Sequence, residues 1–292
     1  MAAIVIDGKA IAAKFKEEIR DRVSRIKQLR IIPCLAVVLV GEDPASASYV
    51  RGKQKALADL GMDGLDIRLP EMLSQEELLK IIATLNADPK VHGILVQLPL
   101  PPQINEETIL AAIEPVKDVD CFHPVSLGKL IRGQGGYLPC TPQAVVVLLQ
   151  ELKIPISGSH AVVIGRSNIV GKPIATLLAR KELNATVTVC HTGTKDLPFF
   201  TRHADILISA VGQPGLIKGD MIKKGAAVID VGIRMVGGEG GTRRRMVGDV
   251  VFEEALETAG WITPVPGGVG PMTIAMLMKN VAEAAEIINN LQ

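Results

Sequence analysis

The chain has 292 residues, which is enough for one large domain or for two ordinary domains with a core each. Apolar residues make up 48% of the sequence, so a disordered protein is excluded and a globular one is expected. Lys and Arg (32) nearly balance Asp and Glu (31), so the charge gives no reason to propose nucleic acid or an anionic membrane as a partner.

Apolar runs of strand length alternate with helical patterns along the chain. In the first series, strands are expected at 34–40, 65–69 and 93–97, and helices near 44–60 and 74–86. After a Pro- and Gly-rich middle (99–142), a second series of strands is expected at 161–165, 185–190, 204–209 and 226–232. Near-continuous Val, Ile and Ala runs are typical of parallel strands covered on both faces, so the fold class is α/β.

The break between the two series predicts two α/β domains. We expect a first domain at residues 1–140, a second domain of the Rossmann type at 141–270, and a closing helix at 271–292 with Pro271 in its first turn. The glycine-rich stretch 235–249, which contains Arg243 to Arg245, is predicted to be an exposed hairpin whose charges are solvated.

Cysteine usage and the N-terminus indicate a reduced compartment. The sequence contains no C-x-x-C pair and no His at zinc-finger spacing, so neither a disulfide framework nor a metal site is expected. No apolar run approaches the roughly 18 residues of a membrane span, and Asp7 interrupts the stretch where a signal peptide would be apolar. We therefore expect a soluble, cytoplasmic protein. The four cysteines are Cys34, Cys121, Cys140 and Cys190.

The second series contains a pattern that favours a nucleotide site. In "AVVIGRSNIVGKP" a strand leads into Gly165, Arg166 and Ser167, and a helix follows from Gly171. Ser167 stands where the plain G-x-G-x-x-G pattern has its second glycine. The layout still provides a tight turn, exposed N–H groups and a helix N-terminus, which are the features that a pyrophosphate requires.

The end of the next strand bears on the choice of cofactor. NAD sites usually place Asp or Glu there to bind the ribose 2′-hydroxyl, whereas this chain has His191 and Thr192. No carboxylate would repel a 2′-phosphate, and Arg166 is near enough in the pattern to attract one. The sequence therefore favours NADP, although His191 could equally be a hydrogen-bonded residue at a strand end.

The first series carries polar residues where its strands end. Tyr49 and Lys53 are four residues apart on a predicted helix and so share a face. Gln97 ends the third strand, and Asp118 and Asp120 lie in the turn "DVDCFHP". Taken singly, each has a plainer explanation, as a surface helix face, a backbone cap or an Asx turn.

Taken together and in order, these segments resemble the bifunctional methylenetetrahydrofolate dehydrogenase/cyclohydrolases. The resemblance covers essentially the whole chain, and eight ordered motifs carry it: "YVRGKQKA", "GILVQLPLPP", "KDVDCFHP", "PCTP", "VVIGRSNIVGKP", "ATVTVCHTGT", "DVGI" and "TPVPGGVGPMTIAML". It implies two domains flanking a cleft, a closing helix that packs back on the first domain, NADP as cofactor, a folate substrate and a homodimer.

The resemblance also implies roles for individual residues. Lys53 would be the catalytic lysine, Tyr49 would stack on the folate ring, Gln97 would hold the lysine and Asp120 would anchor the pterin. We group these four as catalytic. The implied substrate-binding set adds Val50, Leu98, Pro266, Gly267, Gly268, Val269 and Gly270, and the implied cofactor-binding set is Gly165, Arg166, Ser167, His191, Thr192 and Ile233.

Three positions depart from the family pattern. Cys121 stands where the family commonly has Gly after D-V-D, Gly193 stands where it often has Arg or Lys, and Ala144 stands where it often has Gly. The absence of a basic side chain at 193 bears on the preference for NADP over NAD, because such a side chain could bind a 2′-phosphate.

Two other readings remain open from the sequence. A shikimate- or amino-acid-type dehydrogenase would share the two-domain layout and the G-R-S turn, but it leaves "QLPLPP" and "PVPGGVGPMT" unexplained. A non-catalytic nucleotide-binding regulator would bind cofactor without turnover, and the presence of Lys53, Gln97 and Asp120 argues against it. Binding of a polyglutamate tail by Arg243 to Arg245 is a further hypothesis.

Overall fold

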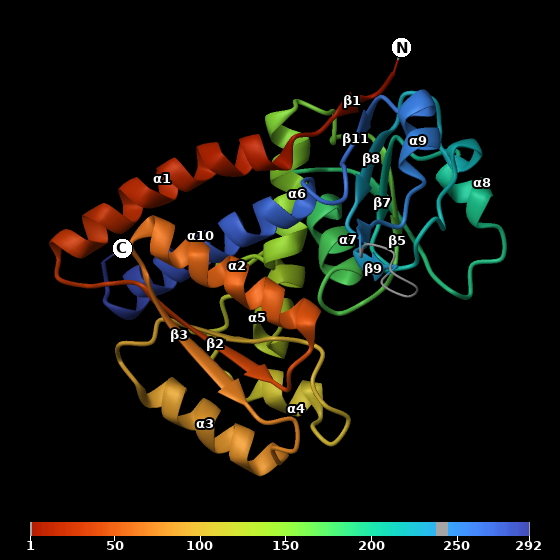
Figure 1. The fold of residues 1–292 in the computed structure, drawn as a ribbon. Helices are drawn as coiled ribbons and strands as arrows, with labels where there is room; N and C mark the ends of the chain where they lie inside the picture. The colour runs from red at the N-terminus through yellow and green to blue at the C-terminus, as the bar shows by residue number, and fades with distance from the viewer. Residues whose placement is uncertain (1, 238–244, 292) are drawn as a thin grey trace. The chain divides into compact units, whose positions relative to one another are not determined.

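The computed structural model describes residues 2–237 and 245–291. The chain divides into two compact units. The first, here named the six-stranded unit, comprises Met1–Ala12 and Thr141–Thr273, and the second, the three-stranded unit, comprises Ala13–Cys140 and Ile274–Gln292. The unit boundaries fall within three helices, α1 (Gly8–Gln28), α6 (Cys140–Glu151) and α10 (Val269–Ile288) (Figure 1).

The three-stranded unit is built on a parallel sheet of order β3-β2-β4. Its central strand reads CLAVVLV and is buried along its whole length, because helix α3 packs on the face of Ala36 and Val38 and helix α2 adjoins the same strand. Strand β3 pairs on one side only and is largely exposed. The elements are β2 (Cys34–Val40), α2 (Pro44–Leu60), β3 (Asp63–Leu69), α3 (Gln75–Ala87), β4 (Gly93–Val96), α4 (Glu106–Ala111) and α5 (Pro124–Arg132).

The six-stranded unit contains a sheet of order β1-β11-β8-β7-β5-β6, in which every described pair is parallel. The strand order reverses between β5 and β7, which is the topological switch point where doubly wound folds bind dinucleotides. The elements are β1 (Ile4–Val5), β5 (His160–Ile164), α7 (Gly171–Ala179), β6 (Thr186–Cys190), α8 (Leu197–Thr201), β7 (Ile206–Ser209), a 3-10 turn (Gly219–Met221), β8 (Ala227–Asp230), β9 (Arg234–Val236), β10 (Arg245–Val247), α9 (Phe252–Thr258) and β11 (Trp261–Ile262).

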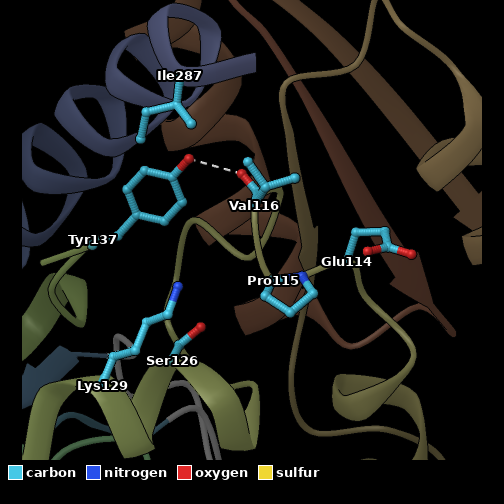
Figure 2. Close-up of a pocket in the computed structure, with 8 residues that line it drawn as sticks. Glu114, Pro115, Val116, Ser126, Lys129, Tyr137 and Ile287 are labelled. Carbon is cyan, nitrogen blue, oxygen red and sulfur yellow. Dashed lines mark hydrogen bonds between the residues drawn. The ribbon is translucent and has the colours of Figure 1, made fainter. Parts of the chain in front are cut away.

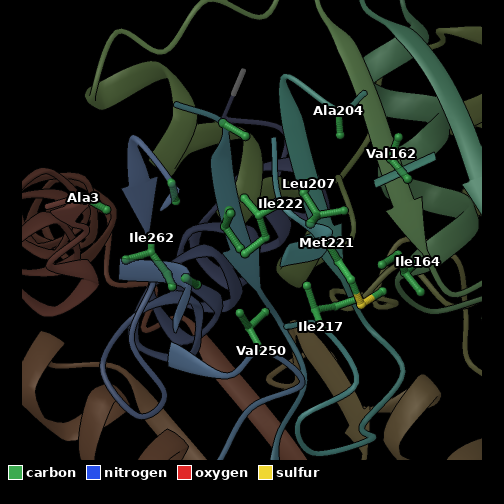
Figure 3. Packing of buried hydrophobic residues seen from close by; sticks show 14 of the residues in the cluster. Ala3, Val162, Ile164, Ala204, Leu207, Ile217, Met221, Ile222, Val250 and Ile262 are labelled. Carbon is green, nitrogen blue, oxygen red and sulfur yellow. The ribbon is translucent and has the colours of Figure 1, made fainter. Parts of the chain in front are cut away.

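A buried apolar cluster holds this sheet together. Figure 3 shows Val162, Leu207 and Ile262, from three different strands, with Met221 and Ile222 from the turn that covers them. These strand residues are less than 1% exposed, and each buried aliphatic side chain of this size contributes roughly 1.5–3 kcal/mol to folding.

The predicted α/β class is confirmed, and the unit boundaries differ from the predicted ones at the N-terminus. Residues 1–12 group with the six-stranded unit because β1 pairs in parallel with β11. In this pairing Ile4 lies opposite Trp261, which is 257 residues later in the sequence. Helix α1 was not predicted from the sequence. The predicted hairpin is present as the antiparallel pair β9 and β10, while Arg243 and Arg244 lie outside the described residues.

Candidate functional site

A lysine and a glutamine form the centre of the predicted folate site. Helix α2 places Tyr49 and Lys53 on one face, and Gln97 follows directly after β4. Lys53 Nζ donates to Gln97 Oε1 over 3.0 Å, and Gln97 Nε2 donates to the carbonyl of Leu98 over 2.8 Å. The second bond fixes the orientation of the amide, so that its oxygen and not its nitrogen faces the lysine.

The surroundings of Lys53 lower its pKa. Burial is the main cause, because it disfavours the charged ammonium, and the nearby carboxylate of Asp120 opposes the shift. Gln97 is neutral, so it orients the amine without adding a charge that would hold the ammonium form. The structure therefore brings three of the four predicted catalytic residues into one electrostatic neighbourhood: Lys53, Gln97 and Asp120.

The turn that carries Asp120 is held by its neighbour Asp118. The buried Asp118 carboxylate accepts hydrogen bonds from the backbone of Phe122 (3.1 Å) and His123 (3.0 Å) and from Ser126 Oγ (2.6 Å). Burial raises the pKa of Asp118, although these three donors oppose the rise. The two carboxylates of "DVD" therefore differ in burial: Asp118 is enclosed by the loop that it stabilises, and Asp120 is only partly buried.

Cys121 occupies a backbone conformation that explains why glycine is common there. Its φ is +60°, in the left-handed region, which costs a non-glycine residue about 1 kcal/mol. The side chain is nevertheless almost completely buried. The departure from the family pattern therefore leaves the local backbone in the glycine-like conformation.

Two further residues of the three-stranded unit support this loop, and the sequence reasoning assigned neither to the site. Cys140 is fully enclosed and its Sγ donates to the carbonyl of Val119 over 3.4 Å. Asn280 Nδ2 donates to the same carbonyl over 2.8 Å and to that of Leu138 over 3.0 Å. Cys140 belongs to the quoted motif "PCTP", whereas Asn280 lies in a helical pattern with no local signal.

The remaining predicted substrate residues are divided between the three-stranded unit and the six-stranded unit. Tyr49 is 36% exposed, so its ring is available to a ligand, and Leu98 is partly buried. Val50 is completely buried and packs into the core, which leaves its side chain without access to a ligand in this structure. Pro266 to Gly270 belong to the six-stranded unit, where they lead from Thr263 into helix α10.

The turn after β5 fits a nucleotide phosphate. Gly165 has φ +116°, and a Cβ there would lie 2.6 Å from the carbonyl oxygen of Ala210, so only glycine fits. Ser167 Oγ accepts from the backbone of Val170 and Gly171 (3.1 and 3.2 Å) and thereby orders the entry to α7. Arg166 and Ser167 themselves are exposed at this sheet edge.

The end of β6 adjoins this turn, because Gly165 N donates to the carbonyl of Cys190. His191 Nδ1 accepts from the backbone of Gly193 over 3.0 Å, so the proton of the neutral ring is on Nε2, which is available as a donor. No carboxylate takes the place that an NAD site would require, since Thr192 and Gly193 follow His191 and both are exposed. Ile233 follows β8 at the same edge.

Among the pockets lined by described residues, two lie within the three-stranded unit and include no predicted site residue. One has a volume of about 340 Å³ and is lined by Val116, Lys129 and Tyr137, whose hydroxyl donates to the carbonyl of Val116 over 2.7 Å (Figure 2). The other, of about 580 Å³, includes Asp63 and His92 at the opposite ends of the strands from Gln97. Among the described residues, no group of three or more His, Cys, Asp or Glu could hold a metal ion.

A nucleotide-type switch point and a lysine of lowered pKa define the class as an α/β enzyme with a dinucleotide-binding unit. The chain belongs to the tetrahydrofolate dehydrogenase/cyclohydrolase family, because residues 6–120 match its catalytic domain and residues 139–289 match its NAD(P)-binding domain. It is 55% identical to the bifunctional protein FolD of Exiguobacterium sibiricum over 284 residues, 97% of this chain and all of the relative.

Solved structures agree with this assignment. The bifunctional FolD enzyme of Campylobacter jejuni superposes with a TM-score of 0.93 at 50% identity, covering 98% of this chain and 99% of the other. The Trypanosoma brucei methylenetetrahydrofolate dehydrogenase-cyclohydrolase, solved with NADP and an inhibitor, gives 0.94 at 42% identity and covers 98% of both chains. Shikimate dehydrogenase of Thermus thermophilus shares only the fold, with a TM-score of 0.52 at 17% identity.

Proposed function

We propose that this chain oxidises 5,10-methylenetetrahydrofolate to the 5,10-methenyl compound with NADP⁺ and then hydrolyses that product to 10-formyltetrahydrofolate. The observation that carries the proposal is the hydrogen bond from Lys53 to the neutral amide of Gln97, in surroundings that lower the pKa of the lysine. The family assignment supplies the folate and the two activities.

The oxidation mainly requires that the protein orient the folate and the cofactor relative to each other. NADP⁺, when bound, supplies the acceptor for the hydride that leaves the methylene carbon between N5 and N10. The resulting cation is delocalised over both nitrogens, so no protein base is required. Tyr49 would stack on the pterin, and the Asp120 carboxylate would accept the adjacent ring N–H and exocyclic amine.

The hydrolysis requires proton transfer by a group of the protein. Water adds to the methenyl carbon and loses one proton. The bond from that carbon to N5 then breaks, N5 takes up a proton, and the remaining hydroxyl proton is released to solvent as the formyl C=O forms. The formyl group remains on N10. Lys53, as a neutral amine, would accept the proton from water and return it to N5, which is the work of a general acid/base. A cationic substrate near the amine would favour its neutral form further.

Replacement of the lysine tests this assignment. We expect Lys53→Met to lower the rate of methenyl hydrolysis by about 100-fold or more, since general acid/base catalysis typically contributes 10²- to 10⁴-fold. The matched control is Lys55→Met, two residues along the same helix and exposed, which should retain both activities. Full hydrolysis by Lys53→Met would eliminate Lys53 as the acid/base.

The assay for the function as a whole supplies methylenetetrahydrofolate with NADP⁺ or NAD⁺. It follows reduction of the nucleotide together with appearance and decay of the methenyl product. No turnover with either nucleotide would refute the proposal. Nucleotide binding without turnover of any folate would favour the regulator, and turnover of shikimate would favour the alternative dehydrogenase.

The preference for NADP rests on the six-stranded unit. Arg166 and His191, with its available Nε2–H, follow the ends of the adjacent strands β5 and β6, and both can donate to a 2′-phosphate. Gly193 supplies no cation, and a Cβ there would lie 3.1 Å from the His191 ring. We therefore expect a preference for NADP⁺ that depends chiefly on Arg166.

We also propose a homodimer located in the cytoplasm. The support for the dimer is strand β3, an exposed edge whose free backbone groups could pair with a second copy, with Leu65 41% exposed on it. Light scattering of the wild type and of Leu65→Lys tests this, and a monomeric wild type would refute it.

The support for the compartment is that all four cysteines are free thiols. None of the described helices is both long enough and apolar enough to cross a membrane.

A further inference from the structure

Two buried carboxylates lie at the end of strand β8 in the six-stranded unit. Asp230 is the last residue of the strand and is 4% exposed, and Asp249 is completely buried. Neither belongs to the predicted site. They are adjacent, because the backbone N–H of Asp249 donates to Asp230 Oδ1 over 3.0 Å.

Each carboxylate is bonded to the exit of a strand. Asp249 Oδ2 accepts from Ser209 Oγ over 2.8 Å and from the backbone N–H of Val211 over 2.9 Å, which fixes the segment that follows β7. Asp230 Oδ1 accepts from the backbone N–H of Gly232 over 3.1 Å, which fixes the segment that leads to Ile233.

The packing around the pair is tight and lacks a counter-charge. A Cβ at Gly232 would lie 2.1 Å from Asp249 Oδ1, and a Cβ at Gly248 would lie 1.9 Å from Asp230 Oδ2. Asp249 Oδ1 has no hydrogen-bond partner, and within the described part of the chain no Lys or Arg side chain bonds to either carboxylate. Burying two carboxylates without a cation opposes folding, so such a pair is expected where it serves a function.

The position of the pair relative to the switch point indicates that function. In doubly wound folds the residue that binds the adenosine ribose follows the strand after the phosphate turn, which here is β6 with His191. The nicotinamide half then lies on the other side of the switch point, over the ends of β7 and β8. Those are the two strand exits that Asp249 and Asp230 hold. The first of them also contacts the phosphate turn, where Ala210 closely approaches Gly165.

We propose that Asp249 and Asp230 are positioning residues for the nicotinamide half of the cofactor, acting through the segments 210–212 and 231–233. They would not touch the reacting atoms. The inference rests on the proposed NADP-dependent oxidation, and it adds that the two activities of the chain depend on this pair to different extents, because hydrolysis needs no cofactor.

Calorimetric titration with NADP⁺ tests the proposal independently of turnover. We expect Asp249→Ala, which removes both bonds to the β7 exit, to weaken NADP⁺ binding by about tenfold or more and to raise the dehydrogenase KM for NADP⁺ similarly. Methenyl hydrolysis should stay within about twofold of wild type. Asp249→Asn keeps one acceptor oxygen, so its affinity for NADP⁺ should lie within about threefold of the wild-type affinity.

The matched control is Asp220→Ala, an exposed Asp in the same unit, which should leave NADP⁺ binding unchanged. If Asp249→Ala does not fold, Ser209→Ala removes a single bond to the same carboxylate and should weaken NADP⁺ binding about threefold. Unchanged NADP⁺ affinity in either folded variant, or a proportional loss of both activities, would overturn the proposal. Wild-type chain that binds NADP⁺ but oxidises no folate would refute the proposed function while leaving the binding comparison valid.

Discussion

Gln97→Glu is the perturbation that best tests why a neutral partner faces Lys53, the proposed acid/base. The amide oxygen of Gln97 lies 3.0 Å from Lys53 Nζ, so the substitution would place a carboxylate oxygen at hydrogen-bonding distance from the amine. The charged pair would then oppose the burial that lowers the pKa of Lys53.

The magnitude follows from Coulomb's law. Unit charges about 4 Å apart attract by about 4 kcal/mol at an effective dielectric constant near 20, which corresponds to about three pKa units. Burial also penalises the new carboxylate, so we expect the pKa of Lys53 to rise by about one to three units. At a pH below that pKa, each unit lowers the fraction of neutral amine about tenfold, and the rate of hydrolysis falls with it.

The assay is the pH dependence of kcat/KM for methenyl hydrolysis. Gln97→Glu should move the midpoint to higher pH and slow hydrolysis at neutral pH by at least about tenfold, with a smaller effect on the oxidation. Gln97→Met, which removes both hydrogen bonds without adding charge, should slow hydrolysis without that upward shift. Gln134→Glu, an exposed position in the same unit, is the control. A folded Gln97→Glu enzyme with wild-type rate and midpoint would refute the reasoning.

Three further predictions concern stability, cofactor choice and titration. Asn280→Ala removes the donor to two backbone carbonyls and should lower the free energy of unfolding in urea by about 2–4 kcal/mol; a change below about 0.5 kcal/mol would contradict this. Arg166→Ala should raise the KM for NADP⁺ by about tenfold and leave that for NAD⁺ nearly unchanged; equal effects on both would show that Arg166 does not bind the 2′-phosphate. Burial raises the pKa of Asp230 to about 7. Because this lies above the unfolded value of about 3.9, the bound proton stabilises the fold fully below about pH 4, and the contribution is lost as the pH rises through 7. A carboxyl-carbon NMR titration of Asp230 should show that midpoint, and a midpoint near 4 would contradict it.

The parts of the fold that the sequence predicts are those where the signal is local. The buried strand 34–40 is an unbroken apolar run, and the helix that follows has an Asp before it and a Gly after it. Helix α1 also carries a local signal, since its buried residues Ala12, Ile19, Val23 and Ile26 have helical spacing. The sequence therefore contains the information that locates this helix.

The features of the fold that the sequence does not predict depend on contacts between segments that are distant in the sequence. The grouping of residues 1–12 with the six-stranded unit depends on two residue pairs between β1 and β11, and two-residue strands have no periodicity to detect. Asn280 likewise reaches a loop more than 130 residues earlier, and only the folded chain shows that its amide holds the carbonyl of Val119. Such contacts decide how the site is supported, although they add no residue to the motifs.

The two pairs of aspartates, Asp118 with Asp120 and Asp230 with Asp249, show the same limit at the level of chemistry. Asp118 and Asp120 stand in one short motif, yet one is bonded to its own loop by three donors and the other is left partly accessible for a ligand. Asp230 and Asp249 are 19 residues apart in the sequence and Asp249 belongs to none of the quoted motifs, yet the two residues are hydrogen-bonded to each other and hold adjacent strand exits. The identity of a residue therefore indicates what it could do, whereas the number of donors that the fold directs at it decides whether it positions the backbone or remains free to bind a substrate. By that criterion the partly exposed Asp120 remains accessible for its proposed role as pterin anchor, whereas Asp118, Asp230 and Asp249 are committed to the backbone segments that they hold.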